Sequence, residues 1–365
     1  MPKYRAAVIG LGWTGLLYDL AERSSEKFHV DDVDRPTPPL EVHRPFYNSP
    51  NPGSDRYPTT YCEALWNRPG IDLVAAADRD RTRLDVFTER YGVRDVYTDA
   101  GQMLSEQRPQ IVAICTNAKG RADLTCLAVK HGVRGILTEK PMAHSLEEAD
   151  RMVRVCAEAA VPLCCGAIST TDPSFSAARE LVRGGAIGEV VSMEAAAPSA
   201  QHQNWAYFLA GDLAWVVGSG DEARRESGSD EFRGQGFIVA EDGLCVHFRH
   251  GAPQLRVSGT EGEISFDPRT GWSLVQATGT GKARQPEPCP WPVTQFKPPY
   301  GAVHCLTDIL DCLEGRLDEP KNSGRCVATA LEVEVALKLS SARGGARVDL
   351  PLTDRAAGLN YDWFR

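Results

Sequence analysis

Strand-sized apolar runs alternate with amphipathic stretches through the first part of the chain. The apolar runs lie at 6–9, 71–77, 109–115 and 135–138. Helical spacing of apolar positions is found at 16–22, 59–66 and 122–131. Continuous apolar runs are typical of strands buried on both faces, and strand–helix alternation is typical of a doubly wound parallel sheet. The pattern therefore predicts an α/β domain over residues 1–145, with ligands at the carboxyl ends of its strands.

The second part of the chain has a different pattern, in which apolar and polar positions alternate with a period of two. Predicted strands lie at 190–195, 236–240, 244–248, 255–258 and 263–266, with turn residues between them. Such alternation is typical of an antiparallel sheet with one buried face. Residues 146–365 are therefore predicted to form an α+β domain around a large, open, mostly antiparallel and largely meandering sheet. Its second face is free to carry a site or an oligomer contact.

A glycine-rich turn lies between the first strand and the first helical stretch. It has the form GxGxxG, and a strand before it and a helix after it are the context in which this motif predicts a dinucleotide site. One glycine makes the turn, one lets backbone approach a pyrophosphate, and one lets helix and strand pack, as in a Rossmann domain. A structural turn with accidental glycines is the alternative. The expected cofactor contacts are Gly10, Gly12, Trp13, Thr14 and Gly15.

An acidic residue at the end of the second strand should hold the ribose hydroxyls, about 20 residues after the glycines. The first good candidate is Asp78, which lies much later in the chain. The excess is a stretch rich in Pro, Asp and Arg over residues 23–58, which we interpret as an insertion in or after the first helix. Loops this long are usually functional lids or partner surfaces, or else poorly ordered, and both interpretations stay open.

The residues around Asp78 bear on the choice of cofactor. Its carboxylate favours NAD, because it repels the 2′-phosphate of NADP. Arg79, Arg81 and Arg83 follow, and an arginine at this place accommodates that phosphate. NAD is therefore the expected cofactor, with NADP as the alternative.

Polar residues also follow two later strands of the first domain. Thr116 and Asn117 follow one strand, and Glu139, Lys140 and Pro141 follow the next. Because ligands bind at the carboxyl ends of parallel strands, a side chain here should face the nicotinamide half of the cofactor. A lysine that is partly desolvated beside a cofactor can have a lowered pKa and so donate or accept a proton. Lys140 is therefore the candidate acid/base. An ordinary solvated lysine is the alternative.

Taken in order, these motifs resemble the Gfo/Idh/MocA family (glucose-fructose oxidoreductase, inositol dehydrogenase and rhizopine catabolism). Similar segments follow at 184–190, 257–264 and 323–352, so the resemblance covers nearly the whole chain apart from the insertion. It implies an NAD(P)-dependent oxidoreductase whose open sheet packs near the cofactor and often forms homodimers or homotetramers. It also implies a C-terminal helix and tail that return toward the Rossmann domain. The further cofactor contacts implied are Asp78, Arg79, Thr116, Asn117, Glu139 and Lys140.

The segment 201–211 departs from that family. Relatives usually carry a histidine on a helix here, with an aspartate or its replacement three residues earlier, and the histidine typically relays the hydroxyl proton. No register of this segment supplies both residues. Glutamine and asparagine hydrogen-bond a sugar hydroxyl but do not exchange a proton near neutral pH. Further departures at 169–173 and after Asn117 indicate a rebuilt substrate site.

Candidates for the substrate site follow from this comparison. The expected substrate contacts are Lys140, Thr171, Gln201, His202 and Asn204. The expected catalytic residues are Lys140, His202 and Asn204. A histidine at a polar helix start is alternatively a surface or capping residue.

Composition narrows the class of protein. Forty Lys and Arg against forty-nine Asp and Glu leave a net charge of −9, which gives no electrostatic footprint for nucleic acid. No apolar run approaches the ~20 residues of a membrane span, and the first strand begins too early for a signal peptide. Eleven scattered cysteines predict reduced thiols, and no His/Cys cluster has the spacing of a metal site. A cytoplasmic protein with a small-molecule substrate and neither nucleic-acid nor membrane partners is expected.

Three functions stay open. The first is hydride transfer between nicotinamide and a hydroxyl-bearing carbon of a sugar, polyol or related cyclic small molecule, with Lys140 moving the proton. The second keeps bound NAD but is redox-neutral, with transient oxidation permitting elimination, epimerisation or glycoside cleavage. The third is a non-catalytic sensor with the insertion as its interaction surface. The first is favoured, because Lys140 alone can move the proton.

Overall fold

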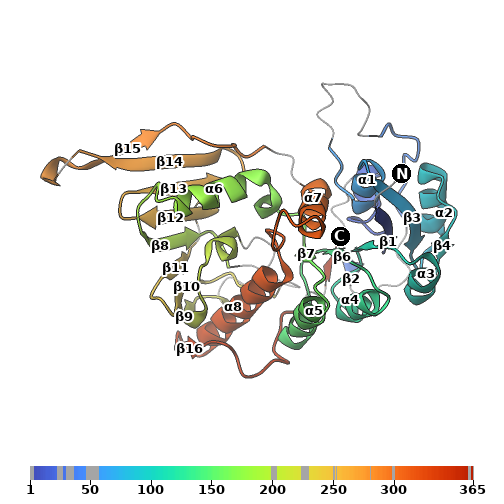
Figure 1. Ribbon diagram of the computed structural model, residues 1–365. Helices are drawn as coiled ribbons and strands as arrows, with labels where there is room; N and C mark the ends of the chain where they lie inside the picture. Colours follow the sequence, from blue (N-terminus) through green and yellow to red (C-terminus); the bar gives the residue numbers. More distant parts are fainter. Residues whose placement is uncertain are drawn as a thin grey trace. The chain divides into compact units, whose positions relative to one another are not determined.

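The computed structural model divides the chain into two compact units, each described separately below (Figure 1). The first unit comprises residues 1–167, 299–325 and 360–365, and the second comprises 168–298 and 326–359. The division expected at residue 145 stays a prediction. The described residues are 4–22, 28–29, 37–46, 57–198, 204–222, 230–249, 251, 253–279, 281–297, 301–360 and 363–364.

A six-stranded parallel sheet forms the centre of the first unit. Its order is β4-β3-β1-β5-β6-β7, and every neighbouring pair is parallel. The strands are β1 (Tyr4–Ile9), β3 (Ile71–Ala77), β4 (Val96–Tyr97), β5 (Ile111–Ile114), β6 (Gly135–Thr138) and β7 (Leu163–Cys165). Strands β5 and β6 are buried throughout, as expected where both faces of a sheet are covered. The predicted parallel sheet is confirmed.

Helices of the first unit pack around this sheet. They are α1 (Tyr61–Trp66), α2 (Arg81–Tyr91), α3 (Ala100–Gln107), α4 (Arg121–Lys130), α5 (Leu146–Glu158) and α7 (Ala302–Leu313). Although α7 lies far along the chain, its residues Ala302, Leu306 and Ile309 enter the same core as β1 and β5. A separate antiparallel pair joins β2 (Phe28–His29) to β17 (Trp363–Phe364).

The expectation of a helix directly after the glycine turn, at 16–22, is wrong. Only the short 3₁₀ helix η1 (Leu17–Asp19) forms there. In a continuous α-helix, Thr14 O would accept from the residue four positions later. It accepts instead from Tyr61 N at 3.0 Å, and Gly15 O accepts in the same way from Cys62 N at 3.1 Å. The insertion therefore interrupts the first helix, and α1 continues it on the far side.

A nine-stranded sheet forms the centre of the second unit. The strands are β8 (Val190–Ala195), β9 (Leu213–Ser219), β10 (Gln235–Ala240), β11 (Cys245–Phe248), β12 (Leu255–Gly259), β13 (Gly262–Asp267), β14 (Gly271–Thr278), β15 (Gln285–Cys289) and β16 (Val348–Asp349). Their order is β15-β14-β13-β12-β8-β11-β10-β9-β16, and only β8 and β11 pair in parallel. The predicted mostly antiparallel sheet is confirmed. It meanders less than expected, because β8 lies between β11 and β12.

One face of this sheet is apolar and covered by helices. Helix α6 (Pro173–Arg183) packs on it through Phe175, whose ring lies 4.8 Å from that of Phe266 in β13. Helix α8 (Gly324–Ala342) packs where Gly218 leaves room, since a Cβ there would lie 2.5 Å from a carbonyl oxygen of the helix. A row of directly paired, buried positions crosses seven strands: Val216, Ile238, Val246, Met193, Val257, Ile264 and Leu274.

The opposite face of the same sheet mixes charged and aromatic side chains. Glu194 pairs with Arg249 at 3.2 Å and with Arg256 at 2.9 Å. Elsewhere on this face the rings of Trp215 and Phe237 lie 5.6 Å apart. Such a surface suits the oligomer contact expected from the sequence, and that contact stays a prediction.

Candidate functional site

Close backbone packing shapes the glycine turn after β1. A Cβ on Gly15 would lie 2.1 Å from Gly10 O, and one on Gly10 would lie 2.9 Å from Thr116 N. Gly10 also has a φ of +92°, in the left-handed region that favours glycine. Gly12 differs, because the atom nearest to a Cβ there is Cys115 O at 4.0 Å. The turn is therefore tightly packed at Gly10 and Gly15, whereas a Cβ at Gly12 would make only an ordinary contact.

Backbone N–H groups of this turn are available to a ligand. In the part of the chain that the structure describes, those of Gly12, Trp13 and Thr14 donate to no protein acceptor. The Gly12 carbonyl, by contrast, accepts from Leu16 N at 2.9 Å and Leu17 N at 3.1 Å, which fixes the turn. Adjacent free N–H groups in a tight turn bind anions such as phosphate. The turn therefore fits a pyrophosphate by its backbone.

Asp78, at the end of β3, closes one side of the turn. Its Oδ2 accepts from Leu11 N at 2.5 Å, and its Oδ1 accepts from Asp80 N at 2.8 Å. The carboxylate therefore bridges the glycine turn and the first residues of α2. Each carboxylate oxygen has a further lone pair to offer, so the position suits ribose hydroxyls. The neighbouring Arg79 is exposed.

Lys140 follows β6, at the edge of the sheet where the glycine turn also lies. Its side chain crosses Gly166, where a Cβ would lie 3.0 Å from Lys140 Cγ. Gly166 O accepts from Asn322 Nδ2 at 3.0 Å, so the backbone beneath the lysine is itself held. The peptide bond between Lys140 and Pro141 is cis. The half-buried stem of Lys140 therefore rests on a fixed strand end.

Arg121, at the first position of α4, is a site residue that the sequence reasoning missed. Its buried guanidinium donates to the carbonyls of Thr116, Glu139 and Pro141, and so joins the ends of β5 and β6. Burial lowers the pKa of Arg121, and the neighbouring Glu139 opposes that shift. The sequence offered one signal for this role, a cation on the side of a helix that faces the sheet. A charge buried there requires partners. Asn117 lies between these anchored strand ends and α4.

Glu139, an expected cofactor contact, directs its carboxylate inward. Oε1 accepts from Tyr61 Oη at 3.1 Å and from Ala167 N at 3.2 Å, while Oε2 accepts from Lys140 N at 3.2 Å. Burial, then the nearby Cys305 and Glu139, raise the pKa of Tyr61 well above its usual value, so its hydroxyl stays a donor. Glu139 therefore positions the backbone of Lys140, and direct contact with a cofactor stays a prediction.

Two candidates for the substrate site lie in the second unit, at the short helices η2 (Ser169–Thr171) and η3 (Asn204–Phe208). Thr171 is buried and donates to Ile168 O at 2.7 Å. Asn204 is also buried, and its Oδ1 accepts from Ser169 Oγ at 3.2 Å and from Thr170 Oγ1. Its Nδ2 donates to no acceptor among the described residues.

The remaining substrate candidates, Gln201 and His202, lie outside the described residues. Lys140 belongs to the first unit, whereas Thr171 and Asn204 belong to the second. Their convergence on one substrate stays a prediction. No group of three or more His, Cys, Asp or Glu side chains among the described residues could hold a metal ion. None of the described helices is long and apolar enough to span a membrane.

Comparison with known proteins finds sequence similarity to oxidoreductases over part of the chain. Residues 53–167 match the oxidoreductase family with an NAD-binding Rossmann fold, Gfo/Idh/MocA, and the expected resemblance is confirmed. D-apiose dehydrogenase of Paraburkholderia graminis is 36% identical over 119 residues, which span 33% of this chain and 32% of that protein. Myo-inositol 2-dehydrogenase of Thermotoga maritima is 27% identical over 137 residues, 38% of this chain and 41% of that protein. The matches therefore span about a third to two fifths of each relative.

A solved structure is similar over a much longer stretch. The oxidoreductase domain protein from Kribbella flavida has a TM-score of 0.68 and 18% sequence identity, covering 96% of this chain and all of that one (100%). At this identity the likeness shows the fold. It extends the agreement from the matched domain to the second sheet.

Proposed function

Because residues 53–167 belong to the oxidoreductase family with an NAD-binding Rossmann fold, we propose that this chain is an NAD-dependent oxidoreductase. It transfers a hydride between nicotinamide and a hydroxyl-bearing carbon of a sugar, polyol or related cyclic small molecule. The dehydrogenases of apiose and myo-inositol among its relatives support this substrate class. As those matches cover only part of each relative, the activity of the whole chain is a proposal.

The observation that carries the proposal is the glycine turn, where Gly12 has room for a Cβ and the neighbouring backbone N–H groups donate to no acceptor among the described residues. In this proposal the pyrophosphate lies on that turn and the adenosine ribose lies at Asp78. The nicotinamide half extends toward the ends of β5 and β6, where Thr116 and Lys140 lie. Backbone amides rather than net positive charge hold the phosphates, which is consistent with an acidic chain.

Lys140 is the proposed acid/base. Bound NAD supplies the hydride acceptor. The neutral Lys140 Nζ takes the proton of the substrate hydroxyl. The carbon that carries this hydroxyl loses its hydrogen as hydride, and a carbonyl compound is left. In the reverse direction the Lys140 ammonium returns that proton. Arg121 holds the two strand ends and Gly166 supports the lysine stem, so both are positioning residues.

The experiment uses the full chain, with NAD+ binding measured by calorimetry and turnover measured on a panel of sugars and polyols. We expect NAD+ to bind and at least one compound to give reduced nicotinamide, followed by its absorbance. Product formed without net reduction would instead support the redox-neutral alternative. A chain that binds no dinucleotide would contradict both.

A further inference from the structure

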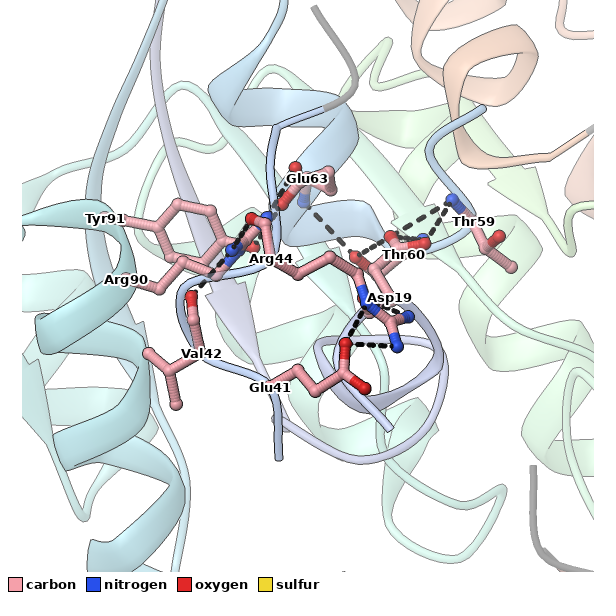
Figure 2. Close-up of polar contacts among 9 residues, drawn as sticks. All are labelled: Asp19, Glu41, Val42, Arg44, Thr59, Thr60, Glu63, Arg90 and Tyr91. Carbon is pink, nitrogen blue, oxygen red and sulfur yellow. Dashed lines mark hydrogen bonds and ion pairs between the residues drawn. The ribbon is translucent and has the colours of Figure 1, made fainter. Parts of the chain in front are cut away.

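Part of the insertion is firmly attached to the first unit. We call its described residues 37–46 the strap. Arg90 of α2 donates from Nη1 to the carbonyls of Val42 and Arg44, each at 2.8 Å. The ring of Phe46 lies 4.2 Å from the Arg90 Cζ atom, which adds a cation–π contact. Figure 2 shows the hydrogen bonds of Arg90 to the two strap carbonyls.

The cation that holds the strap is itself part of a buried ion pair. Arg90 Nη2 lies 2.9 Å from Glu63 Oε1, with side chains only 1% and 0% exposed. Tyr91 Oη donates to Glu63 Oε2 at 2.9 Å. Removing one partner of a buried pair leaves an uncompensated charge, so such pairs persist where every donor is satisfied. Because the two strap carbonyls accept the hydrogen bonds of Arg90 Nη1, the strap is an integral part of this unit.

A second anchor ties the strap to the segment after the glycine turn. Arg44 Nη1 donates to Asp19 O at 3.2 Å. The buried Asp19 carboxylate accepts from the N–H groups of Thr59 and Thr60, at 3.1 and 2.8 Å, as Figure 2 shows. Asp19 therefore joins the two ends of the insertion at the point where the first helix is interrupted.

The strap begins beside the proposed ribose carboxylate. Thr37 Oγ1 donates to Asp80 Oδ2 at 2.9 Å and accepts from Arg83 Nε at 3.2 Å. Arg83 Nε also lies 3.2 Å from Asp80 Oδ2, and the Arg83 side chain is 13% exposed. Asp80 in turn donates its N–H to Asp78 Oδ1. Thr37, Asp80 and Arg83 are thus each in contact with the other two, next to Asp78.

Resting on the proposed function, we propose that the strap makes the chain selective for NAD+ over NADP+ by holding Arg83 on Thr37 and Asp80. A 2′-phosphate binds where a cation offers free donors. Arg83 keeps its Nη donors, but its Nε is held by Thr37 and Asp80, so its guanidinium stays on the strap and a 2′-phosphate at Asp78 meets the carboxylates of Asp78 and Asp80 instead. Arg79 and Arg81 are exposed on the same segment and are the rival phosphate-binding residues.

The test measures dissociation constants of NAD+ and NADP+ by calorimetry for the full chain and its variants. The wild type should prefer NAD+ by about tenfold or more, since one charge-assisted bond is of that order. Asp80→Asn keeps a helix-capping side chain but releases Arg83, and should tighten NADP+ binding about tenfold. Thr37→Val should do so by about threefold. Adding Arg83→Gln to either variant should abolish the gain.

Matched controls separate this effect from general charge or packing changes. Thr82→Val and Asp85→Asn change exposed side chains of the same helix and should leave the preference unaltered. The ratio of the two constants is unaffected by a misfolded fraction, so partial loss of fold does not mask the result.

The proposal is overturned if the wild type binds NADP+ as tightly as NAD+, or if Arg83→Gln alone weakens only NADP+. It also fails if Asp80→Asn and Thr37→Val leave the ratio unchanged in a chain that binds NAD+. Binding of neither dinucleotide by the wild type would end the proposed function as well.

Discussion

The two units use buried polar side chains in opposite ways. In the first unit Arg121, Asp19 and Glu63 are buried so that they hold backbone and neighbouring segments, while three N–H groups of the glycine turn donate to nothing in the described part of the chain. In the second unit the expected substrate residues Thr171 and Asn204 are themselves buried in internal hydrogen bonds. The first unit therefore offers a ligand its backbone, and these two side chains of the second unit are largely committed to its own structure.

This difference explains why the sequence predicts one candidate site better than the other. A backbone site requires glycines at particular places, because a Cβ would fill the cradle, and such a requirement is visible as a motif. A side-chain site depends on which polar atoms remain unpaired after packing. Asn204 shows the consequence, since its carbonyl oxygen is used by η2.

The largest effect should come from Lys140→Ala. If Lys140 is the acid/base of the first unit, kcat should fall by about 10²–10⁴-fold, the usual contribution of such a group. Affinity for NAD+ should change little, because the glycine turn and Asp78 are intact. Steady-state kinetics with calorimetry measures both, and Lys130→Ala at the exposed end of α4 is the matched control. A nearly unchanged kcat would remove the chemistry from the first unit.

A smaller effect should separate two glycines of the same turn. In Gly12→Ala the new Cβ makes only an ordinary contact, with Cys115 O at 4.0 Å, so thermal stability should hold while NAD+ binds about tenfold or more weakly, since a methyl group obstructs the approach of phosphate. Gly15→Ala places its Cβ 2.1 Å from Gly10 O and should destabilise the fold itself. Thermal unfolding and calorimetry compare the two. Equal NAD+ binding by Gly12→Ala and the wild type would show that this backbone is not the cofactor site.

The smallest effect on turnover should come from Asn204→Ala. Ser169 and Thr170 lose a buried acceptor, so the free energy of unfolding in urea should fall by about 1–3 kcal/mol. We expect kcat to change less than about threefold, because the Asn204 carbonyl oxygen already serves η2. Ser176→Ala, a half-buried position on α6, is the control for loss of a polar side chain in this unit. A large fall in kcat with unchanged stability would restore the catalytic role expected from the sequence and break the contrast between the units.

Local pattern predicted the parts of the fold that repeat a simple rule. The parallel sheet followed from continuous apolar runs, and five strands of the second sheet followed from alternation. Strand β15 was missed because its sequence, with Pro286 and Pro288, reads as loop and occupies an edge where missing N–H groups are tolerated. The helix predicted at 16–22 does not form, because the carbonyls of Thr14 and Gly15, which would accept its first N–H groups, are taken by α1, a competition that no local window contains.

The sequence alone determined the Rossmann-like fold of the first unit, the position of the glycine turn and the carboxylate that follows β3, since each depends on residue types at fixed local spacing. Only the tertiary structure decided what surrounds them. Arg121 reaches three carbonyls from two strand ends, and the strap meets Arg90 although Val42 and the arginine are 48 positions apart in the sequence. Contacts of that kind arise from packing between distant segments. Their donors and acceptors are common residue types that carry no local signature.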